Sequence, residues 1–317
     1  MSAAIPRAAM AARKSFLAGA TSGVVEAPHR VFLYGVPGIG KTTFGADAPK
    51  PFFLDLQSGS TRMNVTRAPG VETFDDVKAA IEELTNEEHP FETLVIDTVD
   101  DLEGKIWNHI CKRDGQENIT AYGYGKGYDV AFDEWRLLVA HLERLQRRKN
   151  MRVILIGHSQ TTVFKNPEGP DYERYSPSIN AKAGGLLVKW CDTVLFARQE
   201  IYVATDKKTK RTRGVATDLH VMHTSRTAAY DAKNRDQLPE TMTLDWSEFS
   251  AGVVDKAQSA IGDIQAEIEG LMESIPESKR DAVKAAITDA GDNAAKLARV
   301  LNKARATVKA AEGESVA

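Results

Sequence analysis

The sequence has little cysteine and no long hydrophobic run. Its 317 residues include two cysteines, Cys111 and Cys191. Two cysteines are too few for a disulfide framework or a cysteine-based zinc site, and they fit a reducing cytosol. His220 and His223 lie three apart in a strand-like pattern, hence on opposite faces, which argues against protein-bound zinc. No apolar run approaches the roughly 18 residues of a membrane span, so we expect no membrane partner.

The sequence also lacks an excess of either charge. Its 41 basic and 44 acidic residues leave a formal net charge of −3. No global basic field therefore attracts nucleic acid, and such binding would need a local patch or an assembled groove. Hydrophobic residues make up 42% of the chain and charged residues 27%, which is typical of a globular protein and not of a disordered one.

The first part of the chain, residues 1–30, differs from the rest in composition. Residues 1–25 are rich in alanine and carry Arg7, Arg13 and Lys14 but no acidic residue. We interpret this part as a flexible or subunit-contacting N-terminal arm. A transit peptide, which has a similar composition, is the alternative.

Residues 31–250 and 251–317 are the predicted core and the predicted tail. The core contains every aromatic residue of the chain except Phe16, whereas the tail contains no aromatic residue and is rich in alanine. Thin apolar stripes, interrupted at Pro276 and Gly291, predict two or three helices in the tail. Packing within the protein and contact with a partner or a neighbouring subunit remain open as interpretations of these stripes.

The core alternates between strand-like and helix-like patterns. Apolar runs predict strands at residues 30–34, 51–56, 93–97, 152–157, 192–197, 219–224 and 242–244. Apolar residues at three- and four-residue spacing predict helices at residues 41–47, 74–85 and 131–148. Strands that are buried on both faces and alternate with helices predict an α/β fold, with a mostly parallel sheet flanked by helices.

Residues 35–42 read GVPGIGKT and match the phosphate-loop pattern G-x-x-x-x-G-K-[ST]. Glycines allow the backbone to turn its N–H groups toward a phosphate, the lysine reaches the β- and γ-phosphates, and the threonine hydroxyl ligates Mg²⁺. An apolar strand leads in and a helical pattern leads out, as this motif requires. The predicted nucleotide-binding residues are Gly35, Val36, Pro37, Gly38, Ile39, Gly40, Lys41, Thr42 and Thr43.

An acidic residue after a second apolar strand completes the pattern. Leu94-Val95-Ile96-Asp97 predicts that Asp97 holds Mg²⁺ together with Thr42. Asp97 is followed by Thr98 and not by the glutamate that ring-forming AAA+ motors usually carry there. The guanine-reading pattern N-K-x-D is absent from the sequence. The predicted cofactors are therefore ATP and Mg²⁺.

With these motifs in order, the sequence resembles the RecA/RadA class of recombination ATPases, and most of all the phage-encoded RecA-like single-strand annealing proteins. The resemblance spans about residues 25–250 and rests on the segments GVPGIGKTTF, FFLDLQSGS, TLVIDT, YGYGKGY, VILIGHSQ and AKNRDQLPETMTLDW. It implies a RecA-like P-loop core, ATP and single-stranded DNA as ligands, strand annealing in phage recombination, a ring or filament of identical subunits, and the cytoplasm of a bacterial host.

The resemblance also implies roles in ATP hydrolysis. The family's catalytic glutamate aligns with Gln57, which can orient a water but cannot accept its proton. Weak hydrolysis is therefore expected, with Asp55 or another acid as a substitute base. Gln160 aligns with the glutamine that senses the γ-phosphate, and His158 lies beside it.

Two segments are predicted to be DNA-binding loops, at residues 120–128 and 161–189. Interleaved aromatic, glycine and basic residues suit single-stranded nucleic acid, because bases stack on aromatic rings while cations meet phosphates. A surface loop without a ligand is the alternative for each. The candidate residues are Tyr122, Tyr124 and Lys126 in the first segment, and Phe164, Lys165, Arg174, Tyr175 and Lys182 in the second.

The segment Lys233-Asn234-Arg235 resembles the KNR motif of bacterial RadA. The resemblance implies that Lys233 and Arg235 reach the γ-phosphate bound by a neighbouring subunit. Arg226 is the competing candidate, and a solvated run of charge is the alternative.

Two other functions remain open beside annealing. One is an ATP-dependent DNA motor, helicase loader or packaging accessory, which the glutamine at position 57 disfavours. The other is a nucleotide-gated oligomeric scaffold whose tail recruits a single-strand-binding protein.

Overall fold

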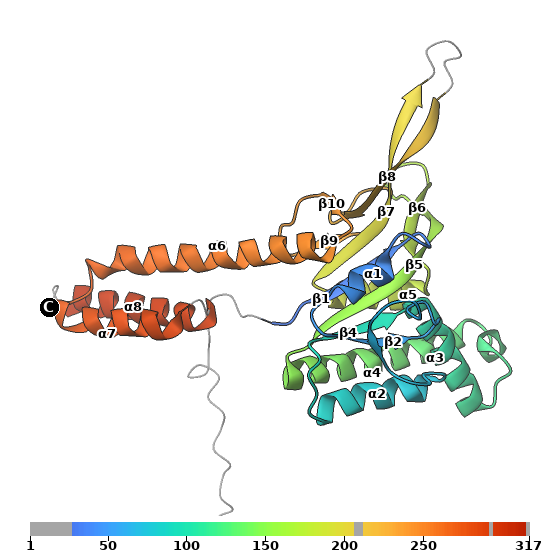
Figure 1. The fold of residues 1–317 in the computed structure, drawn as a ribbon, viewed down its shortest axis with the longest axis horizontal. Coiled ribbons are helices and arrows are strands. Elements are labelled where there is room, and N and C mark those ends of the chain that lie inside the picture. The colour runs from blue at the N-terminus through green and yellow to red at the C-terminus, as the bar shows by residue number, and fades with distance from the viewer. Residues whose placement is uncertain (1–26, 206–211, 292–293, 315–317) are drawn as a thin grey trace, which may run out of the picture. The chain divides into compact units, whose positions relative to one another are not determined.

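A mixed β-sheet with helices on both faces forms the larger part of the molecule (Figure 1). The computed structural model describes residues 27–205, 212–291 and 294–314. Its strands are β1 (Arg30–Gly35), β2 (Pro51–Asp55), β3 (Thr66–Arg67), β4 (Thr93–Asp97), β5 (Arg152–Phe164), β6 (Tyr172–Pro177), β7 (Thr193–Thr205), β8 (Thr212–His223), β9 (Lys233–Asn234) and β10 (Thr241–Thr243). Its helices are α1 (Lys41–Ala46), α2 (Phe74–Asn86), α3 (Val99–Asp114), the 3-10 turn η1 (Ile119–Tyr122), α4 (Lys126–Lys149), α5 (Ala181–Trp190), α6 (Trp246–Met272), α7 (Glu277–Ala290) and α8 (Ala294–Glu314).

The strands follow the order β10-β8-β7-β1-β5-β4-β2-β3. The pairs from β7 through β3 are parallel, whereas β8 and β10 add antiparallel strands at one side. Strand β5 lies between β1, which leads into the phosphate loop, and β4, which ends at Asp97. This arrangement confirms the predicted fold class, a mostly parallel sheet flanked by helices. It also brings the carboxyl ends of β1, β4 and β5 to one edge of the sheet, where α/β proteins bind ligands.

Two separate apolar cores cover the faces of the sheet. In β1, Phe32 and Tyr34 pack with helices α2 to α5, whereas Val31 and Leu33 pack with α1 and the start of α6. The alternation follows from the two-residue period of a strand. Both sets are buried, which explains why the strand reads as a continuous apolar run.

The contacts divide the chain into two units, Ala27–Lys256 and the part from Ala257 onward. In the second unit, the end of α6 shares a small apolar core with α7 and α8. Its fully buried residues include Ile268, Leu297 and Ala304. The thin apolar stripes of the tail therefore pack, at least in part, against one another. None of the described helices is long and apolar enough to cross a membrane.

The second predicted DNA-binding loop is not a loop. Strand β5 continues to Phe164 and pairs in antiparallel register with β6, so residues 152–177 form a strand-turn-strand hairpin, and α5 follows from Ala181. The sequence contains a signal for this, since the β-branched and aromatic residues Thr-Thr-Val-Phe end at a turn that reads NPEGPD. The first predicted loop is also shorter than expected, because η1 occupies residues 119–122 and α4 begins at Lys126.

Helix α3 was missing from the predicted elements, although local signals mark both of its ends. Thr98 caps its N-terminus by accepting a hydrogen bond from the backbone N–H of Asp101, and Gly115 ends it in a left-handed conformation. Leu102 and Ile106 repeat at helical spacing and are fully buried. The helix follows Asp97 almost immediately and so begins at the predicted nucleotide site.

Glu103, in the second turn of α3, is a buried carboxyl group that anchors α5. Both of its oxygens accept the backbone N–H of Asn180, at 3.0 Å each, and Asn180 caps the N-terminus of α5. Burial raises the pKa of Glu103 to about 7, from an ordinary value near 4.5. The folded protein therefore binds a proton here in a pH range where the unfolded chain has already lost it.

This difference makes stability depend on pH. Between about pH 4.5 and pH 7 the folded state holds more protons at Glu103 than the unfolded state does, so the free energy of unfolding falls as pH rises through this window. We expect a Glu103→Gln variant to lose that decline, on the order of 2 kcal/mol, because the amide stays neutral and its oxygen still accepts from Asn180. Urea unfolding at pH 5 and pH 8 measures it, with exposed Glu87→Gln as the control. Parallel pH profiles for the wild type and Glu103→Gln would contradict the assignment.

Candidate nucleotide site

The phosphate loop joins β1 to α1 at the carboxyl edge of the parallel strands. Gly38 and Gly40 have φ angles of 74° and 108°, in the left-handed region that favours glycine. Gly35 is required for a different reason, because a Cβ there would lie 2.1 Å from the carbonyl oxygen of Ala197 on β7. The remaining predicted residues fill the loop and the first turn of α1: Val36, Pro37, Ile39 and Thr43.

Lys41 lies at the start of α1 with its side chain folded back over the loop. Its Nζ donates hydrogen bonds to the carbonyl oxygens of Gly35 at 3.2 Å and Val36 at 2.9 Å. The residue is 6% exposed, and burial lowers its pKa, while the nearby Asp97 carboxylate opposes this shift. An ammonium that is poorly hydrated and hydrogen-bonded to two carbonyl oxygens is well placed to bind phosphate oxygens.

Thr42 and Asp97 meet across the sheet edge. The Thr42 hydroxyl donates to Oδ2 of Asp97 at 2.7 Å, although 55 residues separate them in sequence. Asp97 is 4% exposed, and burial raises its pKa. A cation bound beside Asp97, in addition to Lys41, would oppose this rise in pKa, because it stabilises the charged carboxylate.

A magnesium ion fits this pair. Hydroxyl and carboxylate oxygens are the hard ligands that Mg²⁺ prefers, and the ion commonly takes only one or two protein ligands beside nucleotide phosphates and water. In the described part of the chain, no group of three or more His, Cys, Asp or Glu side chains could hold a metal by itself. Thr42 and Asp97 would therefore hold Mg²⁺ jointly with a nucleotide, whose negative charge the ion offsets.

The residues at the expected position of the catalytic base cannot readily accept a proton. Gln57 donates from Nε2 to the Thr98 hydroxyl at 3.3 Å. The Asp55 carboxylate accepts the backbone N–H groups of Gly59 at 3.0 Å and Ser60 at 2.9 Å, so it holds the loop that follows β2. Asp55, which the sequence suggested as a substitute base, therefore holds this loop in place.

Gln160 lies within β5 and not at the end of a strand, because β5 continues past it to Phe164. Its Nε2 donates to the carbonyl oxygen of Pro177 at 3.1 Å, within the hairpin of β5 and β6. His158, two residues earlier, is the residue that stands opposite Gly35 in the parallel register. His158 is also bound by Asp100, a residue that sequence analysis did not single out.

The candidate DNA-binding residues of the hairpin divide into exposed and covered ones. Lys165 lies at the turn and pairs with Asp171 at 2.5 Å, and the Phe164 ring lies 5.1 Å from that of Tyr172. The Arg174 side chain is only 5% exposed and pairs with Asp231 at 2.6 Å. This burial corrects the expectation that Arg174 stands on an exposed loop.

Tyr175 is covered in a similar way. Its ring stacks on Phe196 of β7, with 5.0 Å between ring centroids, and its backbone N–H donates to the carbonyl oxygen of Ala229. Lys182, in the first turn of α5, is exposed and pairs with Asp129 of α4. Of these hairpin residues, Lys165 is exposed, Phe164 and Tyr175 are half-buried, and Arg174 is buried.

The first predicted loop presents one aromatic side chain to solvent. Tyr124 is fully exposed and lies between Gly123 and Gly125, all three with positive φ. Tyr122 instead donates its hydroxyl to the carboxylate of Asp114 at 2.7 Å. Lys126 is exposed as the first residue of α4, so Tyr124 and Lys126 form the accessible part of this segment.

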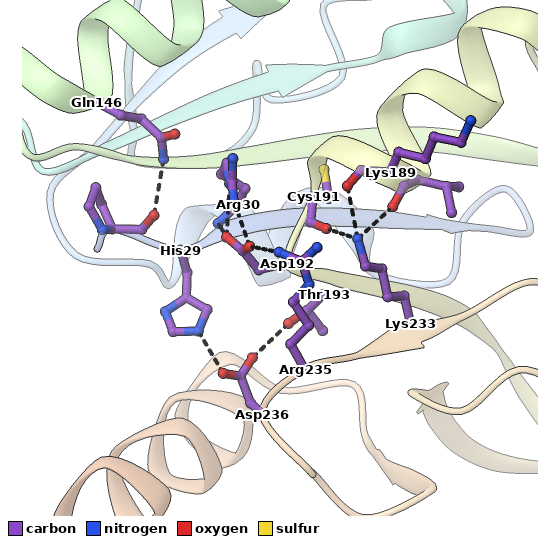
Figure 2. A network of polar contacts seen from close by, with 12 residues as sticks. His29, Arg30, Gln146, Lys189, Cys191, Asp192, Thr193, Lys233, Arg235 and Asp236 are labelled. Atoms are coloured by element: carbon purple, nitrogen blue, oxygen red, sulfur yellow. Dashed lines mark hydrogen bonds and ion pairs between the residues drawn. The ribbon is translucent and has the colours of Figure 1, made fainter. Parts of the chain in front are cut away.

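The KNR segment is bound within its own subunit (Figure 2). Lys233 Nζ donates to the last carbonyls of α5, at 3.0 Å from Val188, 2.9 Å from Lys189 and 2.6 Å from Cys191. A cation at this position stabilises a helix C-terminus. These contacts correct the expectation that Lys233 is free to reach a neighbouring subunit.

Arg235 and Asp236 extend the same network (Figure 2). Arg235 lies 3.0 Å from a carboxylate oxygen of Asp192, which also binds Arg30 at 2.6 Å. Asp236 lies 3.2 Å from Nε2 of His29. These residues surround the first residues of β1 and β7, whereas the phosphate loop follows the last residue of β1, so the segment lies at the opposite end of the strand.

Comparison with known proteins identifies the family of the chain. No curated protein matches the chain. A solved structure, the crystal structure of the RadB recombinase, aligns with a TM-score of 0.35 and 15% sequence identity over 62% of this chain and 80% of that one. The model of the AAA domain family matches residues 27–236, which span the phosphate loop, Asp97 and the KNR segment. The chain therefore belongs to the AAA domain family, and its fold is a mostly parallel α/β sheet flanked by helices.

Proposed function

We propose that this protein binds ATP with Mg²⁺, binds single-stranded DNA, and promotes strand annealing or pairing in phage homologous recombination. The observation that carries the proposal is the contact between Thr42 and Asp97 beside the buried Lys41. These three residues come from two strand ends and match the parts that hold a nucleoside triphosphate and its metal ion in P-loop proteins.

ATP binding would exchange contacts that the loop now makes with itself. Lys41 would leave the carbonyl oxygens of Gly35 and Val36 for the β- and γ-phosphates, and Thr42 would turn its hydroxyl from Asp97 toward Mg²⁺. The first exchange would replace hydrogen bonds to neutral carbonyls by hydrogen bonds to anionic phosphates, and the second would replace a hydrogen bond by coordination of the metal ion.

The DNA interface is proposed at the exposed side chains of the two segments that sequence analysis singled out. Tyr124 offers a fully exposed ring on which a base can stack, and Lys126 follows it at the start of α4. The hairpin offers the exposed Val163 and Lys165, with the half-buried ring of Phe164 between them. The part of β5 that pairs with β6 begins at Ser159, directly after His158, which stands opposite Gly35 of the phosphate loop. This proximity supports coupling between nucleotide and DNA.

We further propose that identical subunits assemble into a ring or filament in the cytoplasm of a bacterial host. Arg235, whose side chain is 56% exposed, and Arg226, which is 63% exposed, are the proposed residues that approach a neighbour's nucleotide. The tail, which has a small core of its own, is proposed to recruit a single-strand-binding protein.

Fluorescence anisotropy with a labelled single-stranded oligonucleotide tests this function. We expect binding that strengthens with ATP and Mg²⁺, weakens as salt is raised, and exceeds binding to a duplex of equal length. A Tyr124→Ala variant should bind about tenfold more weakly, since one stacked base contributes about 1–3 kcal/mol. Exposed Leu137 on α4 provides the matched control, Leu137→Ala.

The outcomes separate the parts of the proposal. Absence of DNA binding in every nucleotide state would remove DNA from the function and leave an ATP-binding protein. DNA binding without faster annealing of two complementary labelled strands would contradict the annealing role alone.

A further inference from the structure

The nucleotide site has no glutamate where the family resemblance expects its catalytic base. Gln57 is an amide, Asp55 binds the backbone of the following loop, and Asp97 binds Thr42. Hydrolysis of ATP needs a group that can take the proton of the attacking water. Another side chain must supply this function if the protein hydrolyses ATP efficiently.

Asp100 and His158 form a pair at the same edge of the sheet. Oδ1 of Asp100 accepts the backbone N–H of His158 at 3.0 Å, and Oδ2 lies 2.7 Å from His158 Nδ1. The carboxylate therefore accepts a hydrogen bond from Nδ1–H of the neutral ring, and Nε2 is left as its basic nitrogen. The two contacts fix both the backbone and the ring of His158, and 58 residues separate the partners in sequence.

His158 stands next to the phosphate loop. In the parallel register it lies opposite Gly35, the first loop residue, and Ile156 lies opposite Asp97. Ile154 and Ile156 pack in the core shared with Phe44 of α1, so the two-residue period of the strand places position 158 on the α1 face as well. Asp100 is close enough to raise the pKa of Lys41, and His158 is close enough to lower that of Asp97.

The pair is accessible to water as well as oriented. The side chain of His158 is 26% exposed and that of Asp100 is 19% exposed. A base that receives a proton from water needs such access, and a carboxylate behind the ring stabilises the imidazolium that forms.

We propose that His158, oriented by Asp100, is the general base for ATP hydrolysis in this protein. The inference rests on the proposed nucleotide site. Water forms a bond to the γ-phosphorus, the bond between that phosphorus and the β,γ-bridging oxygen breaks, and ADP leaves with the bond's electron pair. The proton of the water passes to Nε2 of His158 and then to solvent. Asp100 acts as a positioning residue, through the ring.

Steady-state hydrolysis by purified full-length variants tests the assignment. We expect His158→Gln to lower kcat at least a hundredfold, within the range that a general base contributes, while the affinity for a fluorescent ATP analogue stays within about threefold. Asp100→Asn should lower kcat at least tenfold, because the amide does not hold the required tautomer. A second Asp–His pair, Asp75 with His109 on α2 and α3, supplies the matched control His109→Gln, with kcat unchanged.

Chemical rescue distinguishes a base from a structural residue. Added imidazole should raise the kcat of His158→Ala at least tenfold, because it can occupy the vacated space and accept the proton. Failure of rescue, or wild-type kcat in His158→Gln, would overturn the proposal. A wild type that binds ATP and does not hydrolyse it would also overturn this inference while leaving the proposed function intact, whereas absence of ATP binding would refute the proposed function itself.

Discussion

Replacing Lys41 by alanine should weaken ATP binding at least a hundredfold. The Lys41 ammonium is 6% exposed and hydrogen-bonds only to loop carbonyls among the contacts described for it. With ATP bound it would contact two phosphates, and a hydrogen bond to a charged partner contributes about 1.5–3 kcal/mol. The sum of two such bonds corresponds to a factor of a hundred or more in Kd. Titration with a fluorescent ATP analogue at fixed Mg²⁺ measures it.

The control for Lys41→Ala is a lysine outside the site. Lys50 has a side chain that is 62% exposed and pairs with Glu92 at 2.8 Å, so Lys50→Ala should keep the affinity of the wild type. Thermal unfolding should accompany both titrations, because Lys41 also binds the backbone of Gly35 and Val36. Unchanged ATP affinity in folded Lys41→Ala would refute the phosphate-loop assignment.

A Gly35→Ala substitution should destabilise the fold by about 3 kcal/mol or more, at the upper end of overpacking effects. The added methyl group would lie 2.1 Å from the carbonyl oxygen of Ala197 and 2.9 Å from its carbonyl carbon. Both atoms belong to the backbone of β7, which pairs with β1 at this position, so no side chain can move aside. The strands would have to separate where the phosphate loop begins, and ATP binding should fall with stability.

Gly59→Ala provides the matched control. A Cβ at Gly59 would meet no atom within 4 Å, and the residue is exposed. Urea unfolding of both variants measures the difference in the free energy of unfolding. Equal stability of Gly35→Ala and Gly59→Ala would show that β1 and β7 are not in close contact at this position.

The phosphate loop and Asp97 were predictable because each is a local pattern. The segments GVPGIGKT and LVID are contiguous, and each combines a strand with a residue type whose chemistry is specific. The parallel α/β sheet was predictable for a related reason, since strands buried on both faces, such as Leu94 to Ile96, read as continuous apolar runs.

The second DNA-binding segment differs from its prediction because its strands carry no strong pattern of their own. A strand like Thr161–Phe164 is exposed or half-buried and shows no strong apolar pattern, and its conformation depends on pairing with Tyr172–Pro177. Strand preference depends on such neighbours more than helix preference does. The turn residues of NPEGPD were the signal that could have revealed the hairpin.

The sequence by itself determined the class of the protein: the glycines, lysine and threonine of the phosphate loop, the acid after β4, and the α/β alternation all lie within short stretches whose local chemistry specifies them. Tertiary structure alone decided which side chains act together. It brings Asp100 to His158 and places the Asp55 carboxylate against the backbone of the following loop. It also buries Arg174 beside Asp231 and binds Lys233 to the end of α5. These contacts join residues that lie up to 58 positions apart, and they exist because strand order and register, which no short pattern encodes, bring those positions together.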